Sequence, residues 1–192
     1  LKPDYAEAHS NLGSTLQQQG RLEEAEVSYR QAITLKPDYA KAHYNLGVLL
    51  KEQGRLDEAE VSYRQAITLK PDLAEAHSNL GNTLKELGRL EEAEVSLRQA
   101  ITLKPDLAEA HNNLGNTLKE LGRLKEAEVS LRQAITLKPD YTEAHNNLGI
   151  TLKELDRLNE AEASLRQAIT LKPDYAEAHN NLGVMLQGLG RL

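Results

Sequence analysis

The chain has 192 residues, 40% of them hydrophobic and 27% charged, with a formal net charge of −6 and no cysteine. This composition is typical of a folded protein with a well-charged surface. The absence of cysteine excludes disulfides and thiolate sites, and the negative charge argues against a nucleic-acid partner. No apolar run approaches the ~18 residues of a membrane span, and no signal-peptide pattern opens the chain. We therefore expect no membrane association and a cytoplasmic location.

The string Leu-Lys-Pro-Asp recurs every 34 residues, at Leu1, Leu35, Leu69, Leu103, Leu137 and Leu171. A fixed period of this length predicts a solenoid of stacked repeats. The period gives one array of five full repeats and a partial sixth, with the bounds 1–34, 35–68, 69–102, 103–136, 137–170 and 171–192. Repeats 69–102 and 103–136 differ only at Ser78/Asn112 and Glu91/Lys125. The chain starts and stops within its own pattern, so we expect it to be a segment of a longer protein.

The first half of each repeat predicts a helix. Asp4, followed by Glu7 three residues later, predicts an N-terminal capping box. The same Asp-x-x-Glu pattern starts at Asp72, Asp106, Asp140 and Asp174. We expect this helix to end before Gly20, which would adopt the left-handed conformation common after a helix. In the fifth repeat Asp156 occupies the glycine position, where that conformation costs more.

The second half of each repeat predicts another helix, from about Leu22 to shortly before Pro37. The two helices form an antiparallel hairpin, which cannot bury its apolar stripe alone and must stack on its neighbours. Small residues such as Gly13 and Ala25 would allow close helix approach. The apolar bulk is expected from Leu12, Leu16, Leu22, Ile33 and Leu35. The sequence therefore predicts an all-α fold built from 34-residue helix-turn-helix repeats.

These residues resemble a known repeat family. Asn-Leu-Gly at 11–13, with Ala25, Tyr29, Ala32 and Pro37 at their spacing, is similar to the tetratricopeptide repeat consensus over essentially the whole chain. The resemblance implies a right-handed α-solenoid superhelix whose first helices line the concave surface. It also implies a protein-binding function. Histidine at position 9 of each repeat, and leucine for tyrosine at Leu97, Leu131 and Leu165, depart from the consensus without affecting the predicted fold.

One face of each first helix is polar. At 100° per residue, Glu7, Asn11 and Gln18 share a narrow wedge, away from the residues expected to pack. The wedge places an asparagine at the same position in every repeat: Asn11, Asn45, Asn79, Asn113, Asn147 and Asn181. An asparagine amide has a donor and an acceptor, so such a row could bind the backbone of an extended peptide. The row is similar to the asparagine ladder of O-linked N-acetylglucosamine transferases. In the alternative interpretation, these asparagines bond neighbouring helices or loops.

Further candidates share this wedge with the asparagine row. The polar ones are Asn82, Asn116, Glu75 and Glu109, and the apolar ones are Val48 and Ile150, which could seat ligand side chains. Single exposed apolar residues usually need no functional explanation. Some tetratricopeptide domains bind acidic C-termini through a lysine one turn before the asparagine, but only Lys41 stands there. Since glutamates elsewhere would repel an acidic tail, we reject that clamp and expect polar or basic ligands.

Nothing in the sequence predicts catalysis, a metal or a cofactor. The six histidines occur once per repeat, on helices about 8–10 Å or more apart, whereas zinc needs nitrogens at about 2.0–2.1 Å from one ion. We therefore expect the histidines to pack, each with a partner for its second ring nitrogen. There is no phosphate-binding loop and no nucleophile with an associated base motif.

Three functional hypotheses remain open. The leading one is a non-catalytic scaffold that binds a protein or an extended peptide in a groove lined by the first helices. The second is a substrate-recruiting arm of a larger enzyme, such as a glycosyltransferase. The third is a self-assembling head-to-tail array, since no obvious polar helices cap the two ends.

Overall fold

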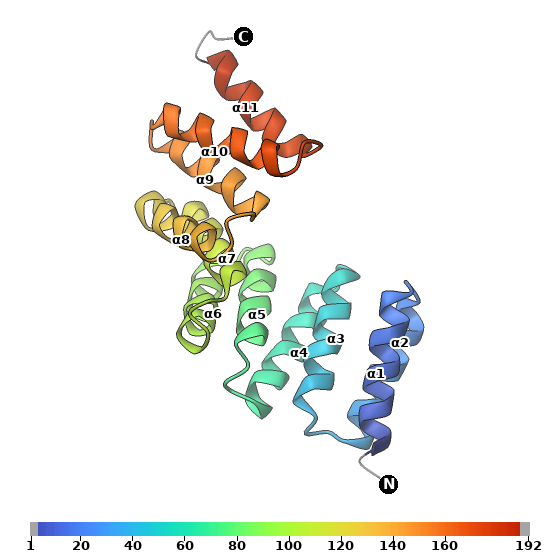
Figure 1. The fold of residues 1–192 in the computed structure, drawn as a ribbon. Helices are drawn as coiled ribbons and strands as arrows, with labels where there is room; N and C mark the ends of the chain where they lie inside the picture. Colours follow the sequence, from blue (N-terminus) through green and yellow to red (C-terminus); the bar gives the residue numbers. More distant parts are fainter. Residues whose placement is uncertain (1–3, 189–192) are drawn as a thin grey trace. The chain divides into compact units, whose positions relative to one another are not determined.

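The computed structural model describes residues 4–188, and all regular secondary structure in this range is α-helical (Figure 1). The helices are α1 (Asp4–Gln18), α2 (Leu22–Leu35), α3 (Ala40–Glu52), α4 (Leu56–Leu69), α5 (Ala74–Glu86), α6 (Leu90–Leu103), α7 (Ala108–Glu120), α8 (Leu124–Leu137), α9 (Thr142–Glu154), α10 (Leu158–Leu171) and α11 (Ala176–Gly188). They form two compact units, unit 1 over residues 1–103 and unit 2 over residues 104–192. Within the described range, no helix is long and apolar enough to cross a membrane.

Each unit is a stack of helical hairpins. In unit 1 the pairs α1/α2, α3/α4 and α5/α6 pack most closely, and α2 and α4 also pack on the following first helices, α3 and α5. Unit 2 repeats this arrangement with α7/α8, α9/α10 and then α11. The all-α solenoid of helix-turn-helix repeats predicted from the period is therefore confirmed.

The turn inside each hairpin follows the prediction. Gly20 has φ of 74°, and the glycines at the same position of the next three repeats have φ of 74° to 76°. Asp156 takes the same left-handed conformation with φ of 59°, the one described non-glycine residue with positive φ. Because glycine lacks a Cβ, it pays no steric cost in this region, whereas Asp156 does.

The predicted aspartate capping boxes are wrong where the structure describes the N-cap. Helices α5, α7 and α9 have Leu73, Leu107 and Tyr141 as their N-cap residues, and none makes a side-chain capping hydrogen bond. Asp72 instead lies inside a turn that is closed by a hydrogen bond from the Leu73 amide to the Lys70 carbonyl at 3.2 Å. Proline at the second position favours such a turn, and the turn moves the helix start beyond the aspartate.

Close helix approach explains the small residues. A Cβ on Gly13 would lie 2.7 Å from Cε1 of Tyr29, and one on Gly81 would lie 2.5 Å from Cγ of Leu97. Side chains from both helices of each hairpin form the core, with Leu16 and Leu49 among its buried members.

Leu12 does not join the core that the sequence predicted for it. Its side chain is 48% exposed, whereas its equivalents Leu46, Leu80 and Leu148 are at most 4% exposed. Those equivalents lie on helices that pack against a preceding second helix. Among residues 4–188, α1 has no such helix before it, which leaves Leu12 uncovered.

Candidate functional site

Consecutive first helices lie side by side in each unit. In unit 1, α3 contacts both α1 and α5, and in unit 2, α9 contacts both α7 and α11. We call the polar face of these helices, which carries the row asparagines, the first-helix surface. The predicted site residues of each unit lie on the first-helix surface of that unit.

The asparagine row lies on these surfaces and is partly engaged with neighbouring helices. Asn11 is exposed, and the other five asparagines are half-buried. Four of them donate from Nδ2 to the preceding first helix: Asn45 to Ser10 Oγ at 3.4 Å, Asn79 to Tyr44 Oη at 3.2 Å, Asn147 to Asn112 Oδ1 at 2.9 Å, and Asn181 to Asn146 Oδ1 at 2.9 Å. Among the described residues, the Oδ1 atoms of these four asparagines have no hydrogen-bond partner. The row can therefore still accept hydrogen bonds.

The other predicted site residues differ in exposure. Asn82, Asn116 and Glu75 are half-buried, and Glu109 is exposed. Val48 is also half-buried and packs against the core of unit 1. Ile150 is half-buried as well.

A tyrosine lies near the carboxylates of the first-helix surface in unit 2. Burial, and secondarily the charges of Glu109 and Glu143, raise the pKa of Tyr141 to about 12. The hydroxyl of Tyr141 therefore stays protonated at neutral pH and remains a donor. This surface combines acceptor-rich carboxylates with a neutral phenol.

Two buried asparagines in unit 2 were not identified from the sequence. Asn112 and Asn146 precede the row by one residue on α7 and α9, and are 5% and 0% exposed. Each accepts a hydrogen bond from the row asparagine one repeat later, Asn147 or Asn181. A helical wheel places them outside the polar wedge. The one sequence signal for this position is the Ser78/Asn112 difference between two nearly identical repeats.

The histidines stabilise the loops before the first helices. In five repeats, Nε2 lies 2.8–3.0 Å from the carbonyl oxygen of the proline six residues earlier: His43, His77, His111, His145 and His179. Because a carbonyl only accepts, Nε2 carries the proton. The expected partner for a ring nitrogen is thus confirmed in these repeats. Within residues 4–188, no group of three His, Asp or Glu side chains could hold a metal ion.

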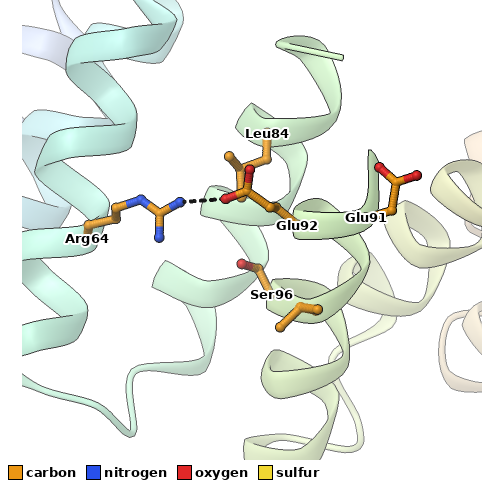
Figure 2. Close-up of a pocket in the computed structure, with 6 residues that line it drawn as sticks. Arg64, Leu84, Glu91, Glu92 and Ser96 are labelled. Carbon is orange, nitrogen blue, oxygen red and sulfur yellow. Dashed lines mark hydrogen bonds and ion pairs between the residues drawn. The ribbon is translucent and has the colours of Figure 1, made fainter. Parts of the chain in front are cut away.

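The second helices carry a different surface. A hollow of about 270 Å³ in unit 1 is lined by Arg64 of α4, Leu84 of α5 and residues of α6. Figure 2 shows Arg64 reaching across it to Glu92, which it contacts at 3.2 Å. A hollow of the same size recurs 34 residues earlier, with Arg30, Leu50 and Val61 in its lining. The hollows therefore follow from repeat stacking and do not mark one special site.

Closed rings of alternating charge join consecutive second helices. One ring runs from Arg30 to Glu26 (2.8 Å), Arg55 (2.6 Å), Glu58 (2.7 Å) and back to Arg30 (3.5 Å). Equivalent rings consist of Arg64, Glu60, Arg89 and Glu92, and of Arg132, Glu128, Arg157 and Glu160. Within each ring the charges cancel. This surface therefore offers little net charge to a ligand.

Comparison with known proteins identifies the repeat type. Residues 4–189 match the family model of the C-terminal domain of cilia and flagella-associated protein 70, a tetratricopeptide domain. No curated protein matches the chain at a significant level.

Several solved structures are similar. YrrB, described as a TPR protein with an unusual peptide-binding site, is 25% identical, with a TM-score of 0.72 over 90% of this chain and 89% of its own. PilW, a type IV pilus biogenesis factor, is 21% identical, with a TM-score of 0.90 over 97% of this chain and 86% of its own. A thermophilic TPR protein of Thermus thermophilus, TTC0263, is 23% identical, with a TM-score of 0.74 over 95% of this chain and 99% of its own. The last two likenesses concern the fold alone.

Proposed function

Since the chain belongs to the family of the C-terminal tetratricopeptide domain of cilia and flagella-associated protein 70, we propose that it is a non-catalytic scaffold that binds a protein or an extended peptide. The proposed binding site is the first-helix surface of each unit. The observation that carries the proposal is the asparagine row, whose members Asn79, Asn147 and Asn181 keep Oδ1 atoms without a partner among the described residues. The unbroken period supports including residues 1–192 in one array.

Two further observations support an extended ligand. Asparagines at one register on adjacent helices offer hydrogen-bonding groups at intervals of about 8–10 Å, the usual distance between packed helices. An extended chain rises about 3.3 Å per residue, so every third residue would meet an asparagine. A peptide-binding site is also described for YrrB. Backbone contacts of this kind place few demands on ligand side chains.

A random-peptide display selection on the whole chain tests the proposal. Affinities of the enriched peptides are then measured by fluorescence anisotropy for the double variant Asn79→Ala/Asn147→Ala. We expect binding to weaken by about 3- to 10-fold for each hydrogen bond lost. The control is Asn159→Ala, which removes an exposed asparagine from a second helix and should leave affinity unchanged. Equal affinity of both variants would place the site elsewhere, and no enrichment on a folded protein would refute peptide binding.

Exposed apolar side chains favour self-association as a second candidate function. Val27, Val61 and Val95 on the second helices of unit 1 are 68–70% exposed. Burial of such side chains is favourable, and repeat surfaces can pair with one another. Sedimentation equilibrium over a wide concentration range should then show a rising mass. A constant monomer mass would exclude this candidate.

A further inference from the structure

The buried asparagines of unit 2 form hydrogen-bonded chains that end on a carboxylate or an amide. Asn181 donates from Nδ2 to Oδ1 of Asn146 at 2.9 Å, and Asn146 donates from Nδ2 to Oε1 of Glu177 at 3.1 Å. Likewise, Asn147 donates to Oδ1 of Asn112, whose own Nδ2 lies 3.4 Å from Oδ1 of Asn113. Each chain connects two neighbouring first helices.

The carboxylate fixes the direction of the first chain. An ionised glutamate only accepts hydrogen bonds, so Asn146 must turn its Nδ2 toward Glu177. Its Oδ1 then faces Asn181 and can only accept, so Asn181 must turn its own Nδ2 inward. The remaining polar atom of Asn181 is Oδ1, which has no partner among the described residues. The orientation of the Asn181 amide therefore follows from Asn146, which is itself 0% exposed.

The described part of unit 1 has no such chain of buried asparagines. The positions of Asn112 and Asn146 hold Ser10 and Tyr44, and the bonds from Asn45 and Asn79 to their hydroxyl oxygens are longer, at 3.4 and 3.2 Å. A hydroxyl can donate or accept, so it does not by itself set the direction of an asparagine amide.

We propose that Asn112 and Asn146 are positioning residues that hold the amides of Asn147 and Asn181 with Oδ1 outward, as acceptors for backbone N–H groups of an extended peptide. This inference rests on the proposed peptide-binding function. In this arrangement the ligand supplies the hydrogen-bond donors, and Asn147 and Asn181 of unit 2 supply the acceptors. Neither Asn112 nor Asn146 is required to touch the ligand.

Amide-to-ester substitution in the ligand tests the direction of these bonds. The probe is the most enriched peptide of the display selection, together with a series of analogues in which one backbone N–H at a time is replaced by oxygen. On the unmodified protein, we expect esters at two or more positions to bind about 5- to 10-fold more weakly. On Asn147→Ala/Asn181→Ala the same esters should bind as well as the parent peptide, because the acceptors are gone.

The positioning role is tested with Asn112→Ser/Asn146→Ser, which installs the residue that unit 1 has at Ser10 and Ser78. We expect weaker binding of the parent peptide and, specifically, a smaller difference between parent and ester. The matched control is Asn180→Ser, at the same register on α11 but exposed, which should change neither. Circular dichroism establishes that each variant is folded.

The outcomes distinguish failure of the positioning role from failure of the proposed peptide-binding function. If the serine variant weakens parent and ester equally, Asn112 and Asn146 act only on stability and the inference fails. If the peptide binds but no ester weakens it, the row does not accept backbone N–H groups, and the inference fails while peptide binding stands. If no peptide binds the folded protein, the proposed function fails and the inference fails with it.

Discussion

The hydroxyl groups of Tyr29 and Tyr63 occupy the same register in successive repeats but differ in hydrogen bonding. The Tyr29 hydroxyl lies 3.1 Å from Ser14 Oγ and 3.0 Å from Gln17 Oε1, both within hydrogen-bonding distance. Tyr63 is 0% exposed, and among the described residues no group lies in hydrogen-bonding geometry with its hydroxyl. The reason lies in the sequence, because Val48 and Lys51 replace Ser14 and Gln17 in the second repeat. Lys51 is engaged instead in an ion pair with a neighbouring helix.

This difference predicts that the same substitution has opposite effects at the two positions. Tyr63→Phe removes a buried hydroxyl whose lost hydration costs about 1–3 kcal/mol. After allowing for a small loss of packing, we expect it to stabilise the protein by about 1 kcal/mol. Tyr29→Phe removes a satisfied hydrogen bond and should destabilise by about 1 kcal/mol. The two variants should therefore differ by about 2 kcal/mol in urea denaturation followed by circular dichroism.

A restored partner gives a second test of the same reasoning. Val48→Ser introduces the hydroxyl that Tyr29 uses at Ser14, and should interact favourably with Tyr63 by about 1 kcal/mol in a double-mutant cycle with Tyr63→Phe. If Tyr63→Phe instead destabilises as much as Tyr29→Phe, and the cycle shows no coupling, the Tyr63 hydroxyl has a hydrogen-bond partner in solution.

Three further perturbations have defined outcomes. Asp156→Gly should raise stability by about 1 kcal/mol in urea denaturation, because glycine adopts the φ of 59° without a Cβ clash; unchanged stability would contradict this. Gly115→Ala should destabilise by about 1–3 kcal/mol, because its Cβ would lie 2.5 Å from Cγ of Leu131; the thermal midpoint checks it. Hydrogen bonding from Arg55 lowers the pKa of Glu26, so this pair stabilises the fold above the unfolded-state pKa of about 4.3 and loses its effect as pH falls through the lower folded-state pKa. Glu26→Gln should therefore flatten the acid side of the stability profile, most clearly at low salt.

Features that depend on local sequence were predictable. The helix ends at Gly20 and its equivalents, and the left-handed conformation at Asp156, follow from which residues tolerate positive φ. The close approach at Gly13 follows from the missing Cβ. The aspartate caps failed because the Lys-Pro-Asp turn competes for the same residues, and a capping pattern alone does not decide between the two.

Features that depend on the neighbouring repeat were harder to predict. The bond from Arg55 to Glu26 spans 29 residues and requires the stacking of two second helices. The exposure of Leu12 depends equally on what precedes its helix. The identity of the asparagine row was clear from the period, but the orientation of its amides was not, because that orientation depends on residues in the preceding repeat.

The repeats at 69–102 and 103–136 show what this dependence means for binding. They differ at only two positions, one of them Ser78/Asn112, and both carry an asparagine of the row. The Asn112 side chain accepts a hydrogen bond from Asn147 of the next repeat. A single serine-to-asparagine change at this register would therefore alter the orientation of the row asparagine one repeat further along the chain. Under the proposed function, the specificity of a row position is thus determined by the repeat before it, and similarity of repeats does not imply equivalence of their binding positions.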